Sequence, residues 1–433
     1  MSRPTVGIVG AGWVGLVTGV CLAELGHDVV VRDIDAARIQ GLREGRVPIY
    51  EPGIAEALER NGARMTYTTD FADLVDRASV AFVCVGTPKT YSGDADLTAV
   101  WHVVDELERT GGAERRLVLA MKSTVPVGTG AKVRAELDRR GLGDVGYVSN
   151  PEFLAEGTAL RDFMEPDRVV IGAFQEADGD AVAALYAPLD TTIVRTDVPS
   201  AEMIKYASNA FLATKISFIN EIANVCEETG ADVSVVAEGM GLDRRIGPHF
   251  LRAGIGYGGS CFPKDVSALK QLAGNSGYHF QLLNAVIEVN ELQKRRVVGK
   301  LEKHLGSLHG KVIALLGLAF KANTNDMREA SSIVLASRLL SEGAFVRAWD
   351  PAAIEEARGM LHGVEFYDDP LAAVDGADAV VVVTEWEELR LLPLAEVSQR
   401  MRTPILVDGR NYLDPAAARE AGLLYDGIGR GAA

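Results

Sequence analysis

The stretch Thr5-Val6-Gly7-Ile8-Val9-Gly10-Ala11-Gly12-Trp13-Val14-Gly15 decides the fold of the first half of the chain. It opens with a short apolar run typical of a buried strand, and a helix-like segment follows as far as Gly26. A second strand is expected over residues 28–32, ending at Asp33, which lies 18 residues after Gly15. This order of strand, glycine-rich turn, helix, strand and acid predicts a dinucleotide-binding α/β unit.

The glycine-rich turn and the acid each have a chemical reason. Glycine permits a tight turn and lets a pyrophosphate approach a helix N-terminus, where amide donors favour an anion. Asp33 would accept hydrogen bonds from the adenosine ribose, which favours NAD over NADP. Its neighbour Arg32 leaves NADP open as an alternative. The expected cofactor-binding positions in this turn are Gly10, Gly12, Val14 and Gly15.

Polar residues follow three further apolar runs of the first half. Buried strands are expected over residues 79–86, 116–122 and 146–149. In open α/β sheets, ligands bind beyond the carboxyl ends of the strands. Thr87, Thr124 and Glu152 follow such ends and are therefore candidate site residues.

The middle of the chain is helical in pattern. Residues 199–229 have no internal Gly or Pro and carry apolar residues at helical spacing. They predict one helix of roughly 45 Å, at about 1.5 Å per residue. Lys205 and Asn209 are four residues apart and would share one face of it.

The strand–turn–helix pattern returns after Gly310, with strands expected over residues 311–316, 345–349, 377–384 and 404–407. This half has no G-x-G-x-x-G, so we do not expect it to repeat the dinucleotide site. The predicted fold class is α/β, with two Rossmann-like nucleotide-binding domains joined by a long central helix and a helical middle domain. The expected domains are residues 1–197, 198–298 and 299–433.

Composition excludes several kinds of protein. The 433 residues are 48% hydrophobic and 24% charged, as in globular proteins. A net charge of −16 argues against nucleic-acid binding, which needs a basic surface. Four cysteines without regular spacing predict neither disulfides nor a metal site and fit the reducing cytoplasm. We also expect no signal peptide and no membrane span.

One cysteine has a different setting from the other three. The stretch Gly254-Ile255-Gly256-Tyr257-Gly258-Gly259-Ser260-Cys261-Phe262-Pro263-Lys264-Asp265 places a thiol in a glycine-rich loop, with a cation and a carboxylate within four residues. A neighbouring cation lowers the pKa of a thiol, and the thiolate is a strong nucleophile. Combined with the dinucleotide-binding pattern at the start of the chain, Cys261 predicts redox chemistry through a covalent thiol adduct. The alternative is a buried cysteine that acts only as a small apolar residue.

Several motifs together resemble the UDP-glucose/GDP-mannose dehydrogenase superfamily, and its UDP-glucose 6-dehydrogenases most. The resemblance runs almost end to end, with Trp13 where the family usually has Tyr and Arg38 where many bacterial members have Lys. Besides the glycine turn and the Cys261 loop, it is carried by residues 48–53, 122–126, 150–157, 205–209 and 243–247, by Phe320-Lys321, by Arg328 and by Asp408-Gly409-Arg410.

The resemblance implies a four-electron oxidation of a sugar C6 alcohol to a carboxylate, with two NAD+ reduced in turn. Cys261 would be the nucleophile that forms a thiohemiacetal and then a thioester. The base for the alcohol proton would be Lys205, or a water held by Asp265. Lys205 and Asn209 would stabilise the oxyanion. The water that hydrolyses the thioester would be held by Glu152, Thr124 or Asp265.

Further binding residues are implied by the resemblance alone. Arg245 would reach the substrate of the neighbouring subunit in a homodimer or larger homo-oligomer, and the last domain would bind the UDP-sugar. On the cofactor side the implied residues are Arg38, Thr87, Thr124, Glu156, Lys264 and Arg328. On the substrate side they are Glu152, Phe153, Leu154, Glu156, Lys205, Asn209, Phe250, Leu251, Arg252, Ala253, Gly254, Gly258, Phe320, Lys321 and Arg410.

Three other functions remain open at the level of sequence. A sister enzyme would act on another nucleotide sugar, such as GDP-mannose or a UDP-N-acetyl-hexosamine. A two-electron hydroxyacid dehydrogenase of the same architecture would leave Cys261 without a task. A non-catalytic nucleotide-sugar sensor would be expected to have lost Cys261, Lys205 or Asp265, and all three are present. Glu152 and Glu156 have their own alternative, as charges in a first helical turn after Asn150-Pro151.

Overall fold

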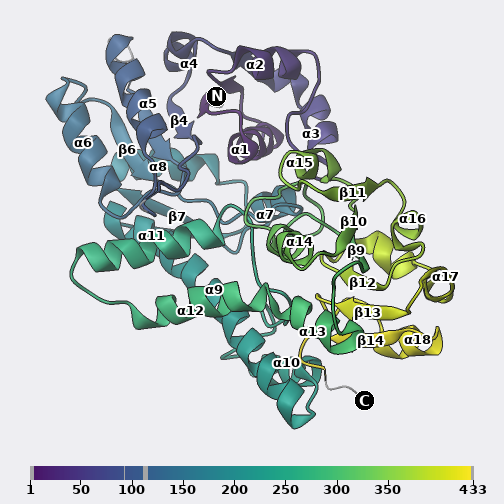
Figure 1. Ribbon diagram of the computed structural model, residues 1–433. Helices are drawn as coiled ribbons and strands as arrows, with labels where there is room; N and C mark the ends of the chain where they lie inside the picture. The colour runs from purple at the N-terminus through teal and green to yellow at the C-terminus, as the bar shows by residue number, and fades with distance from the viewer. Residues whose placement is uncertain (1–3, 92, 111–115, 431–433) are drawn as a thin grey trace. The chain divides into compact units, whose positions relative to one another are not determined.

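The computed structural model describes residues 4–91, 93–110 and 116–430. The chain forms two compact units, Met1–Ser208 and Asn209–Ala433 (Figure 1). No helix within the described ranges is both long and apolar enough to cross a membrane.

The first unit is built on an eight-stranded sheet in the order β3-β2-β1-β4-β5-β6-β7-β8. Neighbouring strands are parallel except for β6 and β7, which pair antiparallel. The strand order reverses direction between β1 and β4, which is where doubly wound sheets bind ligands. The strands are β1 (Val6–Val9), β2 (Val29–Arg32), β3 (Met65–Thr68), β4 (Val80–Val83), β5 (Val118–Met121), β6 (Gly146–Ser149), β7 (Arg168–Ala173) and β8 (Thr192–Thr196).

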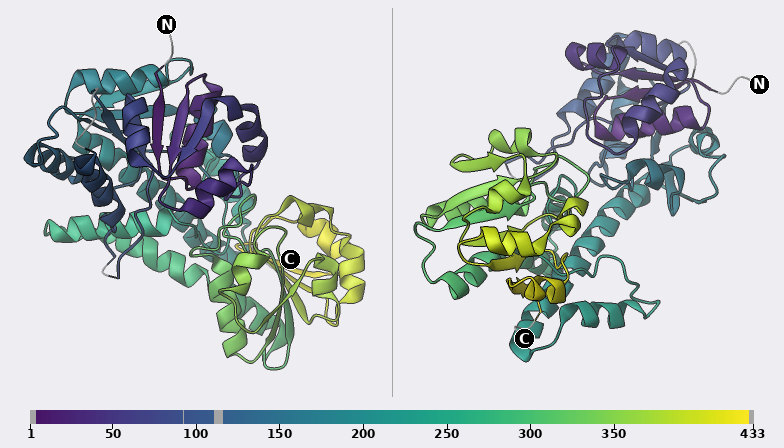
Figure 2. Two further views of the ribbon diagram at one scale, coloured as in Figure 1. Left: turned by 90° about the horizontal axis from the view of Figure 1, so that it is seen from above. Right: turned by 90° about the vertical axis from the view of Figure 1, so that its right-hand side faces the viewer.

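Helices cover both faces of this sheet (Figure 2). Side chains alternate along a strand, so Val29 and Val31 of β2 join one apolar core while Val30 joins the other. Both faces are therefore buried, which is why the strands are continuous apolar runs. The helices are α1 (Trp13–Glu24), α2 (Ala36–Arg43), α3 (Ile54–Arg60), α4 (Phe71–Arg77), α5 (Thr98–Arg109), α6 (Thr129–Arg139), α7 (Ala159–Met164) and α8 (Glu176–Leu185), with a 3-10 turn at Gly62–Arg64.

The helix expected over residues 199–229 is α9 (Val198–Thr229), with 32 residues. Pro199 lies in its first turn, where a missing amide donor costs nothing. Its first residues belong to the first unit and the remainder to the second.

The second unit contains a six-stranded sheet in the order β11-β10-β9-β12-β13-β14, with every neighbouring pair parallel. One continuous core joins the sheet to α9, α10, α13 and α14. The predicted fold class is thus confirmed, with two Rossmann-like sheets and a helical region between them in sequence. The strands are β9 (Val312–Leu316), β10 (Phe345–Trp349), β11 (Val364–Tyr367), β12 (Ala379–Val382), β13 (Ile405–Asp408) and β14 (Leu424–Gly427).

The helices of this unit fall into two groups along the chain. The first group precedes the sheet and consists of α10 (Val233–Gly241), α11 (Phe262–Asn275), α12 (Gln281–Gln293) and α13 (Arg296–Leu305). The second group lies among the strands and consists of α14 (Ser331–Ser341), α15 (Ile354–Arg358), α16 (Pro370–Val374), α17 (Leu394–Arg400) and α18 (Pro415–Glu420), with a 3-10 turn at Glu387–Leu391.

Candidate active site

The glycine turn has the geometry that a dinucleotide requires. Gly10 has φ of +104°, and a Cβ there would meet the Cys84 carbonyl oxygen at 2.8 Å. A Cβ on Gly15 would lie 1.8 Å from the Gly10 carbonyl oxygen. At Gly12, the residue before α1, a Cβ would meet nothing within 4 Å. Two glycines are therefore needed for the turn itself, and the third leaves open space at a helix N-terminus, which fits a pyrophosphate.

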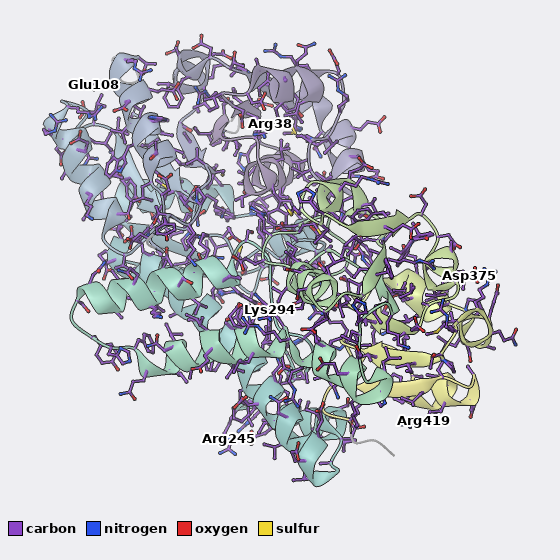
Figure 3. The ribbon with its side chains drawn as sticks, in the orientation of Figure 1. Arg38, Glu108, Arg245, Lys294, Asp375 and Arg419 are labelled. Atoms are coloured by element: carbon purple, nitrogen blue, oxygen red, sulfur yellow. The ribbon has the colours of Figure 1, made fainter. Side chains whose placement is uncertain are left out.

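Asp33 follows β2 and lies against this turn. Its Oδ2 accepts from the Ala11 amide at 2.7 Å and from the Arg38 guanidinium at 3.2 Å. Figure 3 labels Arg38, which lies on α2. Arg32 is buried, pairs with Glu106 and stacks 5.3 Å from the Phe71 ring centroid. Because Arg32 is used inside the fold, it does not offer a cation for a 2′-phosphate, which favours NAD.

Two of the predicted strand-end residues contact each other. The Thr87 hydroxyl donates to the Thr124 carbonyl oxygen at 2.9 Å. Thr124 follows β5 and Thr87 follows β4, and these strands are neighbours in the sheet. The sheet therefore places both residues at its carboxyl edge, as the sequence predicted.

The third strand-end residue, Glu152, forms a buried ion pair. Its Oε1 accepts from the Lys205 Nζ at 2.9 Å, with side chains 6% and 4% exposed, and its Oε2 accepts from the Leu154 amide at 2.7 Å. Burial raises the pKa of Glu152, but the Lys205 charge and hydrogen bond, the Leu154 amide and Lys122 outweigh it and hold the pKa below its ordinary value. The pair therefore holds an ionised carboxylate beside an ammonium donor.

The segment after Glu152 is irregular, and the next helix begins only at Ala159. The interpretation of Glu152 and Glu156 as charges in a first helical turn is therefore wrong. Phe153 lies beneath two cations, 3.6 Å from the Arg168 guanidinium and 5.4 Å from the Lys205 Nζ, measured to its ring centroid.

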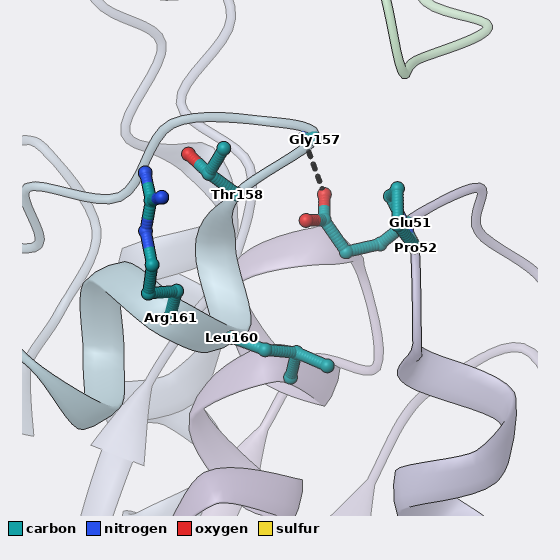
Figure 4. Close-up of a pocket in the computed structure, with 6 residues that line it drawn as sticks. All are labelled: Glu51, Pro52, Gly157, Thr158, Leu160 and Arg161. Carbon is teal, nitrogen blue, oxygen red and sulfur yellow. Dashed lines mark hydrogen bonds between the residues drawn. The ribbon is translucent and has the colours of Figure 1, made fainter.

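Sequence reasoning assigned no role to Glu51, which holds this segment. Its carboxylate accepts from the Gly157 amide at 2.7 Å, from the Ala159 amide at 2.9 Å and from the Trp13 indole at 3.0 Å. Figure 4 shows Glu51 and Gly157 in the wall of a cavity of about 280 Å³. Glu51 lies in residues 48–53, one of the motifs that carry the family resemblance. The residues around it do not indicate its hydrogen bond to Trp13, which lies 38 residues earlier in the chain.

In the second unit, Cys261 is the residue immediately before α11, a helix of 14 residues. The N-terminus of a helix stabilises a thiolate through its amide donors and dipole. The Sγ lies 3.6 Å from the Ser260 hydroxyl, and the thiol is partly exposed. The other three cysteines are buried. This setting supports a reactive thiol over an apolar packing residue.

Asp265 lies in the first turn of α11 and is completely buried. Its Oδ2 accepts from the Asn209 side-chain amide at 2.6 Å, and its Oδ1 accepts from Lys264. Asn209 and Asp265, both predicted to serve the reaction, are thus joined to Lys264, which was predicted to bind the cofactor. Lys264 and Asp265 lie within four residues of Cys261 in sequence, whereas Asn209 comes from α9.

The glycine loop before Cys261 is held by hydrogen bonds on every side. Asn290 accepts from the Tyr257 amide at 2.8 Å and donates to its carbonyl at 3.1 Å. Arg410 donates to the carbonyl oxygens of Gly256 at 2.9 Å and Phe320 at 3.3 Å. The structure therefore brings together the loop, Arg410 and the Phe320-Lys321 segment, which the resemblance assigns to the UDP-sugar.

The other predicted residues of this unit differ in exposure. Leu251, Ala253 and Gly254 are buried, whereas Arg252 and Phe250 are exposed. Phe250 has φ of +64°, a strained value for a residue with a side chain. Arg328 pairs with Asp326 at 2.7 Å. Arg245, labelled in Figure 3, has an 85% exposed side chain and pairs with Asp243 at 2.6 Å.

The glycine turn and the acid after β2 define a dinucleotide-binding protein, and the second unit of the same chain carries a partly exposed thiol before α11. Three family models match along the chain, all from the UDP-glucose/GDP-mannose dehydrogenase family: the NAD binding domain over residues 4–190, the central domain over 199–292 and the UDP binding domain over 314–415. The chain belongs to the UDP-glucose/GDP-mannose dehydrogenase family, and its cofactor is NAD.

Curated relatives match over nearly the whole chain. A UDP-glucose 6-dehydrogenase, TuaD, of Bacillus subtilis is 46% identical over 431 residues, covering 98% of this chain and 93% of that protein. A UDP-glucose 6-dehydrogenase of Pseudomonas aeruginosa is 46% identical, covering 98% and 97%. Among solved structures, a UDP-glucose dehydrogenase from Pyrobaculum islandicum has a TM-score of 0.91 at 39% identity, covering 99% of this chain and 98% of that one. A UDP-D-ManNAc dehydrogenase from Pyrococcus horikoshii has a TM-score of 0.87 at 27% identity, covering 99% and 100%.

Proposed function

We propose that this protein is an NAD-dependent UDP-glucose 6-dehydrogenase, which oxidises the C6 alcohol of UDP-glucose to the carboxylate of UDP-glucuronate. The observation that carries the proposal is Cys261, a partly exposed thiol at the start of a 14-residue helix, in a chain whose full-length relatives bear that name. When bound, NAD+ accepts a hydride in each of the two oxidations. Gly10, Gly12, Gly15 and Asp33 would hold it.

In the proposed reaction Cys261 attacks the C6 aldehyde, and the adduct keeps that aldehyde from escaping between the two oxidations. Asn209 is suited to stabilise the oxyanion, since Asp265 fixes the orientation of its side-chain amide. Lys205, already a hydrogen-bond donor to Glu152, is suited to donate as well. These roles would leave Cys261 as a thioester after the second oxidation.

We assign the hydrolytic water to Glu152. Its carboxylate is ionised, because its pKa is lowered, and an ionised carboxylate can orient a water and accept its proton. Thr124 and Asp265 are the alternatives. Asp265 accepts from Asn209 and Lys264, just as Glu152 accepts from Lys205 and the Leu154 amide, so both carboxylates already hold two donors.

The UDP-sugar would be bound by the glycine loop, Arg410 and the Phe320-Lys321 segment. We further propose the domain division at residues 197 and 298, a cytoplasmic location in keeping with four reduced cysteines, and a homodimer. The dimer is supported by Phe211, Phe218 and Val225 of α9, which are 66%, 49% and 57% exposed and recur every seven residues. In such a dimer Arg245 would reach the partner's substrate.

The test is the number of NADH formed per UDP-glucose consumed, with GDP-mannose and UDP-N-acetylglucosamine run alongside. We expect two NADH from UDP-glucose and little from the other sugars. Cys261→Ser should bind NAD normally and fail to complete turnover, since it lacks the thiol. One NADH per UDP-glucose, or normal turnover by the variant, would contradict the covalent mechanism. Two NADH from another sugar only would move the substrate assignment to a sister enzyme.

A further inference from the structure

Lys122 is a buried cation that the proposed reaction does not use. It follows β5 and is 4% exposed. Its Nζ donates to the Asn150 side-chain oxygen at 3.0 Å and to the Tyr186 hydroxyl at 3.0 Å. The Tyr186 hydroxyl donates to the same Asn150 oxygen at 2.8 Å. The three side chains thus form a closed hydrogen-bonded triangle in the interior.

Aromatic rings enclose this cation. The Nζ lies 5.8 Å from the ring centroid of Phe82, 5.9 Å from that of Phe163 and 5.4 Å from that of Tyr186. A cation near the face of an aromatic ring is attracted by the ring quadrupole, more so when water is excluded. A lysine that served only to fill space would be replaced at less cost by an apolar side chain, because burying a charge is unfavourable.

The triangle connects directly to the Glu152 segment. The Asn150 amide donates to the Val170 carbonyl at 2.8 Å, so both ends of that side chain are fixed. Only Pro151 separates Asn150 from Glu152, and proline restricts the backbone of that short connection. Lys122 therefore helps to fix the position of the backbone from which the Glu152 side chain extends to Lys205.

The titratable groups that act on Lys122 come from three segments of the first unit. They are Cys84 after β4, Glu152 after β6 and Lys205 on α9. Burial lowers the pKa of Lys122 to about 8, so it is mostly protonated at neutral pH. Burial raises the pKa of the Cys84 thiol to about 12, so that neighbour is neutral there. The net effect of Lys122 on Glu152 is that of a second positive charge.

We propose that Lys122 is a positioning residue for the Glu152–Lys205 pair, fixing the Glu152 segment through Asn150 and adding a second buried positive charge that favours the ionised carboxylate. The inference rests on the proposed function only in taking Glu152 as the residue that holds the water. Its electrostatic part is a property of the folded protein and does not require a substrate.

The experiment is an infrared titration of Glu152 in the full-length protein without ligands. The difference between each protein and the same protein carrying Glu152→Gln isolates the carboxyl band of Glu152. Lys122→Met, which removes the charge at similar volume, should raise the titration midpoint by about one pH unit. Tyr186→Phe removes the two hydrogen bonds of that hydroxyl, to Lys122 and to Asn150, but keeps the charge and the ring, and should leave the midpoint where the wild type has it.

Three outcomes would overturn the proposal. These are an unchanged midpoint in Lys122→Met with only a lower melting temperature, an equal shift in Tyr186→Phe, or a shift to lower pH. If Lys122→Met does not fold, Lys122→Gln keeps hydrogen-bonding capacity without the charge and should raise the midpoint in the same way.

A second readout, the pH dependence of kcat, is expected to follow the titration, with the acid limb of Lys122→Met moved to higher pH. Failure of the proposed function would instead show as missing turnover of UDP-glucose by the wild type. The infrared midpoint would still report on Lys122 in that case.

Discussion

The indole of Trp13 connects the cofactor turn to the segment that carries Glu156. Trp13 is the first residue of α1, and its donor bonds to Glu51, whose carboxylate also accepts from the amides of Gly157 and Ala159. One carboxylate thus ties the helix that would face the pyrophosphate to the loop that follows Glu152. A Tyr at position 13 would have a different reach, so this contact depends on the residue present in this chain.

Removing the indole donor should loosen both α1 and the segment at Gly157, which Glu51 holds together. Trp13→Phe keeps the ring and loses one hydrogen bond to a charged group, so the free energy of unfolding should fall by about 1.5–3 kcal/mol. NAD affinity should fall by roughly two- to tenfold, since α1 loses one constraint at its first turn. Chemical denaturation and calorimetric titration with NAD measure the two effects.

The matched control is Trp101→Phe, a half-buried tryptophan on α5 that packs against the other face of the sheet. It should change stability without changing NAD affinity. Equal NAD affinity in Trp13→Phe and the wild type would contradict the connection. Glu51→Gln should lower the free energy of unfolding and the NAD affinity more than Trp13→Phe does, because it removes the charge from all three hydrogen bonds.

At the residue scale, local chemistry was predictable from the sequence and long-range partners were not. The glycine turn, Asp33 and Cys261 each have a signal within a few residues. The partners of Glu51 and Lys122 lie 38 and 64 residues away along the chain, at Trp13 and Tyr186. The sequence around a buried carboxylate or ammonium group does not indicate which distant side chain will form its hydrogen bond.

At the scale of elements, α6 depends on a cap that comes from α9. Gly128 precedes α6 with φ of +94° and has no side chain with which to cap it. The buried carboxylate of Glu202 accepts instead from the amides of Gly128 and Gly130, each at 2.7 Å. The donors that helices leave unpaired in their first turn are thus satisfied from a second helix.

Glu202→Gln should therefore destabilise the protein. Glutamine offers one carbonyl oxygen, and its amide group would face a backbone donor, so the free energy of unfolding should fall by about 1–3 kcal/mol. Chemical denaturation is the measurement, and Glu221→Gln, an exposed glutamate on the same helix, is the control with no expected change. Equal stability of the two variants would mean that the cap contributes nothing.

Apolar patterning predicted the central strands and the long helix because burial on both faces leaves a continuous run of Val, Ile and Leu. It did not predict β3, β7, β8, β11 or β14; the side chains of β3, β8 and β11 are only partly buried and partly polar. It also gave no sign that β7 pairs antiparallel with β6, since pairing direction depends on the connection rather than on composition.

The two sheets use the acid after the second strand in different ways. In the second unit, Asp350 Oδ2 accepts from the Leu318 and Ala319 amides and from the Trp386 indole, and Oδ1 accepts from two more amides. Both carboxylates are buried, but Asp350 accepts these five hydrogen bonds from within the protein whereas Asp33 accepts three, so Asp350 is the less free of the two to accept from a ribose. The absence of G-x-G-x-x-G in that half agrees with this arrangement.

At the scale of the whole molecule, the proposed dimer rests on the apolar row of α9. Phe211, Phe218 and Val225 are each two helical turns apart, so they lie along one face of α9. About half or more of each side chain is exposed to solvent. Phe218→Glu should place two charges at the contact of a symmetric dimer. Since burying one Phe contributes about 1.5–3 kcal/mol, the dissociation constant should rise at least about a hundredfold.

Sedimentation equilibrium measures this change, and Phe345→Glu is the control because it alters an exposed aromatic on β10, outside α9. A dimeric Phe218→Glu protein would show that α9 does not form the contact. If Arg245 serves the partner's substrate, the monomeric variant should also lose UDP-glucose turnover to the same extent as Arg245→Ala. Mixing Arg245→Ala with Cys261→Ser should then restore part of the activity, because a mixed dimer has one site with both an intact Cys261 and a partner that supplies Arg245. Independent subunits would give no such restoration, whatever their mass in solution.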